Sequence, residues 1–188
     1  MPQRAEQSRA VAKRCAILQA ATDLVYIEGL RGVTHRNVAA RAGVPVGSIG
    51  YYYSNRERLL ATCFERIAQQ RHEMVEQSLA GGSAPGDLPE LAELVVRVIA
   101  AGEIGHVAGL VTATVDVKHE SPELNAELIA HWDGINDAVQ SVLDAASYTS
   151  LTGKQLVRSI VGVTVCSMLH DEAETAIVAL TEDIFRGS

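Results

Sequence analysis

The sequence predicts an all-α protein in which an N-terminal three-helix unit, containing a helix-turn-helix, precedes a larger helical body. Apolar residues recur at three- and four-residue spacing along nearly the whole chain, which is typical of amphipathic helices. Capping residues, glycines and prolines interrupt this pattern at short intervals. Only residues 161–165 are β-branched enough to suggest a buried strand. A lone strand would have no sheet to join, so we expect a helix there as well.

Three helices are expected in the first 52 residues. Gly29 ends the first helix and Thr34 is a good N-cap for the second. Gly43 ends the second helix in the left-handed conformation, and Val44-Pro45 turns the chain into the third. The expected ranges are residues 8–28, 34–42 and 46–52.

A longer helix follows, from residue 54 or 55 to Leu79. Ser54 and Glu57 fit a capping box at its start, with Asn55 as the alternative cap. Residues 80–89, rich in glycine and proline, are the clearest break in the chain. Beyond this break, helices are expected at residues 88–101, 103–118, 121–146, 152–169 and 172–185.

The charge is divided unevenly along the chain. Its net value of −7 argues, taken whole, against a polyanionic partner. Residues 1–60, however, carry nine basic and four acidic side chains, a balance of +5, whereas residues 61–188 carry seven basic and nineteen acidic ones, a balance of −12. A basic N-terminal unit on an acidic body indicates that only the N-terminal unit meets a nucleic acid.

Several classes of protein are disfavoured by the composition and by missing motifs. Three cysteines without a short spacing suggest reduced thiols in a cytoplasm, with neither a disulfide framework nor a zinc site. The longest apolar stretch, residues 160–169, is about half of a membrane crossing. HExxH, CxxC, P-loop, GxSxG and GxGxxG signatures are all missing. We therefore expect a cytoplasmic protein with no enzymatic activity, no metal, no cofactor and no membrane contact.

The third helix has the composition of a helix that enters a DNA major groove. Such a helix must be slim, because the groove is only about 12 Å wide. Gly47, Ser48 and Gly50 supply this slimness, while Ile49 turns inward to hold the helix on its neighbours. Of the following tyrosines, Tyr53 is expected in the core, at helical spacing from Ile49. Simple packing for all three tyrosines, and a merely solvated basic face, are the structural alternatives.

Together these residues resemble the TetR regulators. The run GVPVGSIGYYYSNRERLL at residues 43–60 looks like the family's recognition helix and the start of its next helix. Upstream, Ile17-Leu-x-x-Ala21, Gly29, Thr34, Val38-Ala39 and Ala42-Gly43 match at the same spacing, so the resemblance covers residues 13–60. Gly50, where the family most often has tyrosine, and Pro45, where it has a polar cap, depart from the pattern.

The resemblance implies roles for particular residues in DNA binding. Positions that correspond to phosphate contacts hold Thr34, Tyr52 and Arg56. Positions that read bases hold Val46, Gly47, Ser48 and Tyr51. His35 and Arg36, at the exposed start of the second helix, add further backbone contacts.

The acidic body is expected to contain a ligand pocket and the dimer surface. Candidate pocket residues are small or polar groups on apolar helices, namely His106, Thr112, Thr114, Asp116, Trp132, Asn136 and Cys166. Trp132 is equally consistent with a core position. The last two helices carry more than one apolar face, which predicts a homodimer interface with Leu156, Ile160, Val163, Ala173, Ile177, Leu180 and Ile184. A fully buried pair of helices in a monomer is the alternative.

These features predict a homodimeric, sequence-specific repressor that binds a near-palindromic double-stranded operator and is released by a small-molecule effector. Residues 1–55 would form the DNA-binding domain and residues 56–188 the effector-binding and dimerisation domain, with 56–79 as the connecting helix. Because Arg97 and Lys118 are the only bases between residues 88 and 150, the effector is expected to be mainly apolar and neutral or cationic. An enzyme on the helical body and a nonspecific architectural DNA binder are the rival hypotheses.

Overall fold

A computed structural model of the chain describes residues 2–80, 87–170 and 172–186, and every element in these ranges is helical. The expectation of an all-α fold is therefore confirmed. None of the described helices is both long and apolar enough to span a bilayer. The helices are α1 (Pro2–Gly32), α2 (His35–Ala42), α3 (Gly47–Tyr52), α4 (Arg56–Leu79), α5 (Leu88–Ala100), α6 (His106–Asp116), η1 (Val117–His119), α7 (Pro122–Ala145), α8 (Gly153–Ser167), η2 (Met168–His170) and α9 (Ala173–Arg186).

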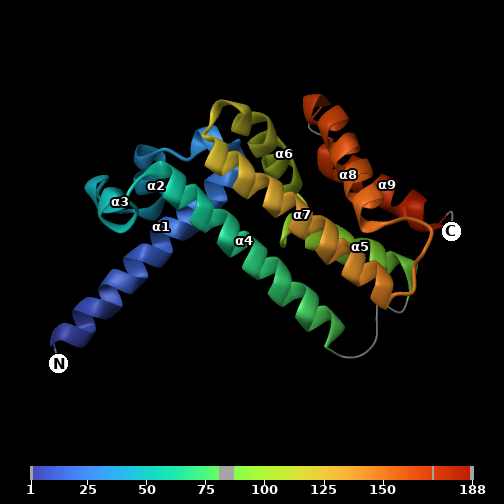
Figure 1. The fold of residues 1–188 in the computed structure, drawn as a ribbon, viewed down its shortest axis with the longest axis horizontal. Helices are drawn as coiled ribbons and strands as arrows, with labels where there is room; N and C mark the ends of the chain where they lie inside the picture. Colours follow the sequence, from blue (N-terminus) through green and yellow to red (C-terminus); the bar gives the residue numbers. More distant parts are fainter. Residues whose placement is uncertain (1, 81–86, 171, 187–188) are drawn as a thin grey trace.

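The N-terminal unit consists of α1, α2 and α3, at the opposite end of the molecule from α9 (Figure 1). The Thr34 hydroxyl accepts a hydrogen bond from the Asn37 amide, so it caps α2 as expected. Gly43 has a φ of 65° and ends α2 in the left-handed conformation. The side chains of Ile49 and Tyr53 are buried beneath α3, and the turn between α2 and α3 is thereby held in the predicted geometry.

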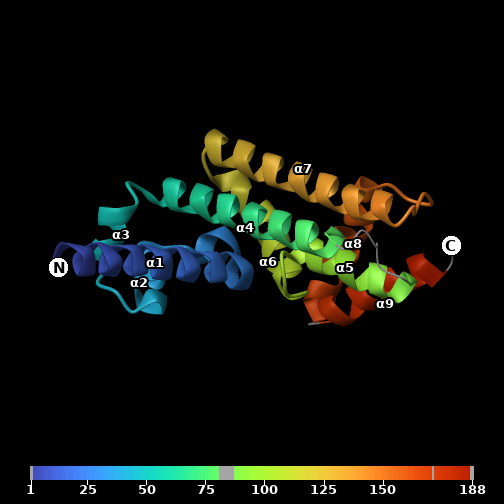
Figure 2. The ribbon, with the colours of Figure 1, turned by 90° about the horizontal axis from the view of Figure 1, so that it is seen from below.

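Helix α4 leads from the N-terminal unit into the body and runs beside α7 (Figures 1 and 2). Its N-cap is Asn55, whose side chain accepts a hydrogen bond from the Arg58 amide. The capping box at Ser54 was therefore the wrong choice, and the alternative cap is the one used. The predicted break falls at the end of α4, although residues 81–86 lie outside the described residues.

Helices α8 and α9 pack against each other and against α7 and α5 respectively. The β-branched residues 161–165 lie within α8, as predicted. Leu156, Ile160 and Ile177 are fully buried within the protomer, so they belong to its own core and cannot present a face to a partner. This corrects their assignment to a dimer interface. Periodicity identifies the apolar faces of a helix, but the neighbours decide which face lies inside.

The remaining residues predicted at the interface are partly buried. Val163, Leu180 and Ile184 pack against the core, and Ala173 is of intermediate exposure. The outward face of α8 is instead made by other residues at helical spacing. We call this set the outer α8 face, although Leu169 lies in η2 and Val161 is only partly exposed: Lys154, Arg158, Val161, Gly162, Val165 and Leu169.

Candidate nucleic-acid interface and ligand cavities

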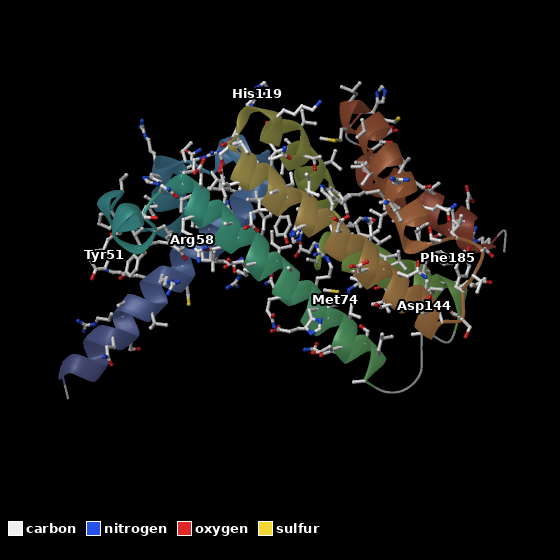
Figure 3. The ribbon with its side chains drawn as sticks, viewed as in Figure 1. Tyr51, Arg58, Met74, His119, Asp144 and Phe185 are labelled. Atoms are coloured by element: carbon white, nitrogen blue, oxygen red, sulfur yellow. The ribbon has the colours of Figure 1, made fainter. Side chains whose placement is uncertain are left out.

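Helix α3 presents a thin and exposed surface. Tyr51 is 82% exposed and Val46 is 52% exposed, and Figure 3 shows Tyr51 far from the body residue Phe185. A Cβ atom added at Gly47 or Gly50 would meet nothing within 4 Å. The surface that was predicted to read bases is therefore free to approach a groove, although Ser48 is only partly exposed.

The inner side of α3 is anchored by aromatic and apolar packing. Tyr53 is buried, as predicted, and the Arg14 guanidinium lies 5.9 Å from the centre of its ring. Burial raises the pKa of the Tyr53 phenol, so the ring stays neutral. The Tyr51 and Tyr52 rings meet edge to face at 5.0 Å, which orients the exposed Tyr51 ring. Only one of the three tyrosines is thus a core residue.

The residues predicted to contact phosphates at the start of α2 differ in accessibility. Thr34 and Arg36 are exposed, and the Thr34 hydroxyl can donate a hydrogen bond while it accepts one from Asn37. The Nε2 atom of His35, in contrast, is buried and has no hydrogen-bond partner. In this conformation His35 therefore cannot use Nε2 on a phosphate.

Arg56, the third predicted phosphate contact, is engaged inside the protein. Its Nε donates to the Val33 carbonyl at 2.8 Å, and one terminal nitrogen donates to the Leu30 carbonyl at 2.6 Å. Both terminal nitrogens also bond the Glu120 carboxylate, at 2.7 and 2.9 Å. The guanidinium thus ties the end of α1 to the segment before α7, and its assignment as a phosphate contact is corrected.

Close backbone approach defines the contact between α1 and α6. A Cβ atom at Gly109 would lie 1.9 Å from the Tyr26 carbonyl oxygen, so only glycine permits this approach. Gly29, with φ 68° and ψ −160°, turns the chain here in a conformation that is essentially restricted to glycine. The Arg31 side chain and backbone amide both bond the buried Asp116 carboxylate, at 3.0 and 3.2 Å. We call this region, which includes the Arg56–Glu120 pair, the α1–α6 junction.

Asp116 was predicted in the ligand pocket, but it belongs to this junction. Its carboxylate is occupied by Arg31, and it lines none of the cavities described below. Cys166 is exposed on α8 and lines none of them either. Both predictions relied on polarity within an apolar helix, which does not distinguish a pocket from a helix contact.

The other candidate pocket residues line two separate cavities. Thr114, Trp132 and Asn136 lie together around a cavity of about 560 Å³ between α6, α7 and α8. Trp132 Nε1 donates to the Thr114 hydroxyl at 2.8 Å. His106 and Thr112 line a different cavity of about 680 Å³ between α1 and α6. There the His106 ring stacks on Tyr26 with a centroid distance of 3.7 Å.

A third cavity, of about 280 Å³ between α4 and α7, contains the buried Arg71 and His131. Sequence analysis missed Arg71, because it considered bases only between residues 88 and 150. The sequence does contain a signal that Arg71 is buried, because it follows Phe64 and Ile67 at helical spacing on the apolar stripe of α4. Burial lowers the pKa of Arg71 to about 10, so it remains charged at neutral pH. Burial, together with the charge of Arg71, lowers the pKa of His131 to about 3, so this ring is neutral.

Comparison with known proteins agrees with the helix-turn-helix geometry. Residues 17–63 match the bacterial regulatory proteins of the tetR family. The match covers α2, α3, most of α1 and the start of α4, which make up the helix-turn-helix part of the chain. No curated protein matches the chain.

Solved structures of other regulators share the fold of this chain. A transcriptional regulator from Saccharomonospora viridis in complex with choline is 13% identical with a TM-score of 0.67, covering 92% of this chain and 95% of that one. FadR from Bacillus subtilis in complex with stearoyl-CoA is 17% identical with a TM-score of 0.57, covering 92% and 95%. The multidrug binding protein EbrR in complex with ethidium is 23% identical with a TM-score of 0.57, covering 90% and 97%.

The match of the N-terminal unit indicates the general function. The chain is a DNA-binding transcriptional regulator whose N-terminal unit matches that of the tetR-family proteins. The match therefore favours a regulator over the enzyme hypothesis.

Proposed function

We propose that the chain is a homodimeric cytoplasmic repressor whose two α3 helices read a near-palindromic operator, and that a mainly apolar small molecule releases it. The observation that carries this proposal is the thin, exposed face of α3, with Val46, Gly47 and Tyr51 outermost and Ser48 partly exposed. Residues 1–55 form the DNA-binding domain in this proposal, and residues 56–188 the effector-binding and dimerisation domain.

Direct base contact is assigned to α3 and phosphate contact to the residues around it. Tyr51 offers its ring and one hydroxyl to base edges, and Ser48 offers a hydroxyl. Thr34, Arg36 and Tyr52 contact the phosphate backbone. Arg56 is left out of this set, because its hydrogen bonds are made within the protein.

Salt-dependent DNA binding tests this assignment. Arg36→Ala is expected to weaken binding to all sequences about equally and to reduce the salt slope by about one, since a phosphate contact carries no base information. Tyr51→Ala is expected to change which sequence is preferred. The measurement is fluorescence anisotropy with DNA from upstream of the chain's own gene and with random DNA. Equal affinity of the native protein for both DNAs would support a nonspecific binder instead.

The second copy in the proposed homodimer packs on the outer α8 face. Leu169 is 88% exposed and Val165 is 51% exposed on this face, and Val115 of α6 is exposed nearby, on the cavity that Val165 also lines. Exposed apolar residues that gather in this way are typical of a protein interface. Arg158 and Lys154 extend the face at its other end.

Sedimentation of charge variants tests the interface. Val165→Glu is expected to give a folded monomer, because the new carboxylate would be desolvated without a partner in the dimer. The comparison variant Ile177→Glu places the same charge in the protomer core and is expected to prevent folding. A folded dimer of Val165→Glu with native stability would place the interface elsewhere.

The proposed effector is mainly apolar and does not carry several negative charges. The neutral or cationic character predicted from the sequence rests on the scarcity of bases between residues 88 and 150. This argument does not extend to the cavity at Trp132, because Lys154 and Arg158 line that cavity beside Asp133. Nor does it extend to the cavity between α4 and α7, because Arg71 already places a positive charge there. The relatives bind ligands as different as choline, ethidium and stearoyl-CoA, so the fold alone does not select the charge.

A further inference from the structure

Arg71 is a buried cation without a counter-ion in the described part of the chain. Its residue is 2% exposed, and no described carboxylate lies within 4.0 Å of the guanidinium. Its Nε donates to the Val98 carbonyl at 2.9 Å, and one terminal nitrogen lies 3.4 Å from His131 Nε2. The first bond links α4 to α5, but it uses only one of the five N–H groups of the guanidinium.

The groups around Arg71 add further donors. Because Nε2 of the neutral His131 ring accepts from Arg71, the ring proton must be on Nδ1. This Nδ1 atom is buried and has no hydrogen-bond partner among the described residues. The Tyr26 hydroxyl is also buried and has no hydrogen-bond partner among the described residues. Burial raises the pKa of Tyr26, and the positive charge of the nearby Arg71 acts in the opposite direction. Hydrogen-bond donors thus exceed acceptors in this region, which is costly unless an acceptor enters.

The cavity beside Arg71 and His131 has room for such an acceptor. Its volume is about 280 Å³, on the order of nine water molecules at about 30 Å³ each. Small and apolar residues form much of the wall, including Val75, Gly134 and Ala138. A Cβ atom added at Gly134 would meet nothing within 4 Å.

The charge around the cavity limits the ligand to a single negative charge. Arg71 supplies one positive charge, and the other buried side chain that lines the cavity, His131, is neutral. Asp137 lines the cavity as an exposed carboxylate, and it would repel a second negative charge. A carboxylate matches the planar guanidinium with one charge, whereas a phosphate near neutral pH brings up to two.

We propose that Arg71, with His131, binds the carboxylate of a small monoanionic effector whose apolar tail lies against Val75 and Ala138. This rests on the proposed function and specifies the chemical class of the effector.

A matched series of six-carbon probes tests the binding step. Hexanoate, 1-hexanol and hexylamine share a tail and differ in the head group. For the native protein without DNA, isothermal titration is expected to show hexanoate binding at least tenfold tighter than the other two. Arg71→Met is expected to abolish this preference, while Arg97→Met, which removes an exposed arginine of α5, is expected to leave it unchanged. Equal binding of the three probes, tighter binding of inorganic phosphate, or unchanged preference in Arg71→Met would overturn the proposal.

A second variant covers the case in which Arg71→Met does not fold. Gly134→Leu keeps the arginine but fills the cavity, and it is expected to weaken hexanoate binding at least tenfold. Native affinity in this variant would exclude the cavity as the site.

Operator binding separates this inference from the proposed function. Hexanoate is expected to release DNA from the native protein and not from Arg71→Met. If hexanoate bound at Arg71 but did not release DNA, the site would not be an effector site. Release by a different ligand, with no carboxylate binding at all, would overturn the Arg71 site and leave the proposed repressor intact.

Discussion

Two arginines of α4 have opposite surroundings. Arg56 donates to two carbonyls at the end of α1 and to both oxygens of Glu120, so its charge and its donors are compensated. Arg71 lies fifteen residues further on, about 22 Å along the helix. It is more deeply buried, and within the described part of the chain its partners are one carbonyl and one imidazole nitrogen, with no carboxylate. The first arginine is part of a completed contact between the end of α1 and the segment before α7, whereas the second keeps N–H groups without an acceptor among the described residues.

The packing around the two arginines differs in the same way. At the α1–α6 junction, Gly109 permits backbone contact with Tyr26, and Asp116 is saturated by Arg31. Beside Arg71, Gly134 faces open space. The junction is therefore closely packed, whereas the groove between α4 and α7 contains open space. The following predictions test this difference.

The largest effect is expected from adding one methyl group at two glycines. Gly109→Ala should lower the free energy of unfolding by more than about 3 kcal/mol, because the new Cβ would overlap backbone atoms of Tyr26 that cannot move independently. Gly134→Ala should raise it by up to about 1 kcal/mol, through helix propensity alone. Urea denaturation measures both. Similar values for the two variants would mean that the junction is not tightly packed.

Removing each arginine is expected to give the next largest difference. Arg56→Met should cost about 2–3 kcal/mol, because Glu120 and two carbonyls lose a charged donor. Arg71→Met should leave the unliganded protein equally stable or more stable, since an uncompensated buried charge is removed. The same urea experiment compares them. A large loss for Arg71→Met would show that its role is structural.

Acid should destabilise the protein through His131. The pKa of this residue is lowered to about 3 by burial and by the charge of Arg71, whereas a histidine in an unfolded chain titrates near about 6.5. Between these values the unfolded chain binds a proton that the native site excludes, so stability falls as the pH decreases, by about 1.4 kcal/mol per unit. At pH 5 the contribution is on the order of 2 kcal/mol relative to pH 7.

The variant His131→Gln, which cannot titrate, isolates this contribution. Its free energy of unfolding should depend less on pH than that of the native protein between pH 6.5 and pH 4, and the two slopes should converge above about pH 8. Parallel pH profiles for the two proteins would place His131 in contact with solvent.

The smallest effect is expected at the ion pair of the junction. Asp116→Asn should lower stability by about 1 kcal/mol or less, because the Arg31 side chain is 68% exposed and solvent screens the pair. The loss should shrink at high salt. Hexanoate affinity should stay unchanged, since Asp116 does not line the cavity of Arg71. A change in hexanoate affinity would show that the α1–α6 junction and the cavity of Arg71 are energetically coupled.

Local chemistry in the sequence was sufficient to predict the helices and the DNA-binding unit. Thr34 and Gly43 cap α2 through neighbours three or four residues away, and the slimness of α3 follows from its glycines. Short-range hydrogen bonds and periodicity do not depend on the rest of the fold. For the same reason Tyr53 was correctly expected in the core.

The roles of Arg56, Asp116 and Ile177 depended on the tertiary structure. Each was assigned from its position or polarity, but the partners of Arg56 come from residues 23, 26 and 64 positions away, and those of Asp116 from 85 positions away. Helix α9 has more than one apolar face, and packing within the protomer buries the face that contains Ile177. Arg71 became visible as a site only once α4, α5 and α7 were placed together. The sequence by itself determined which segments are helical and which unit reads DNA, because these follow from local periodicity, capping and charge. Only the tertiary structure decided which charges are compensated, because a counter-ion is defined by distance in space and not along the chain.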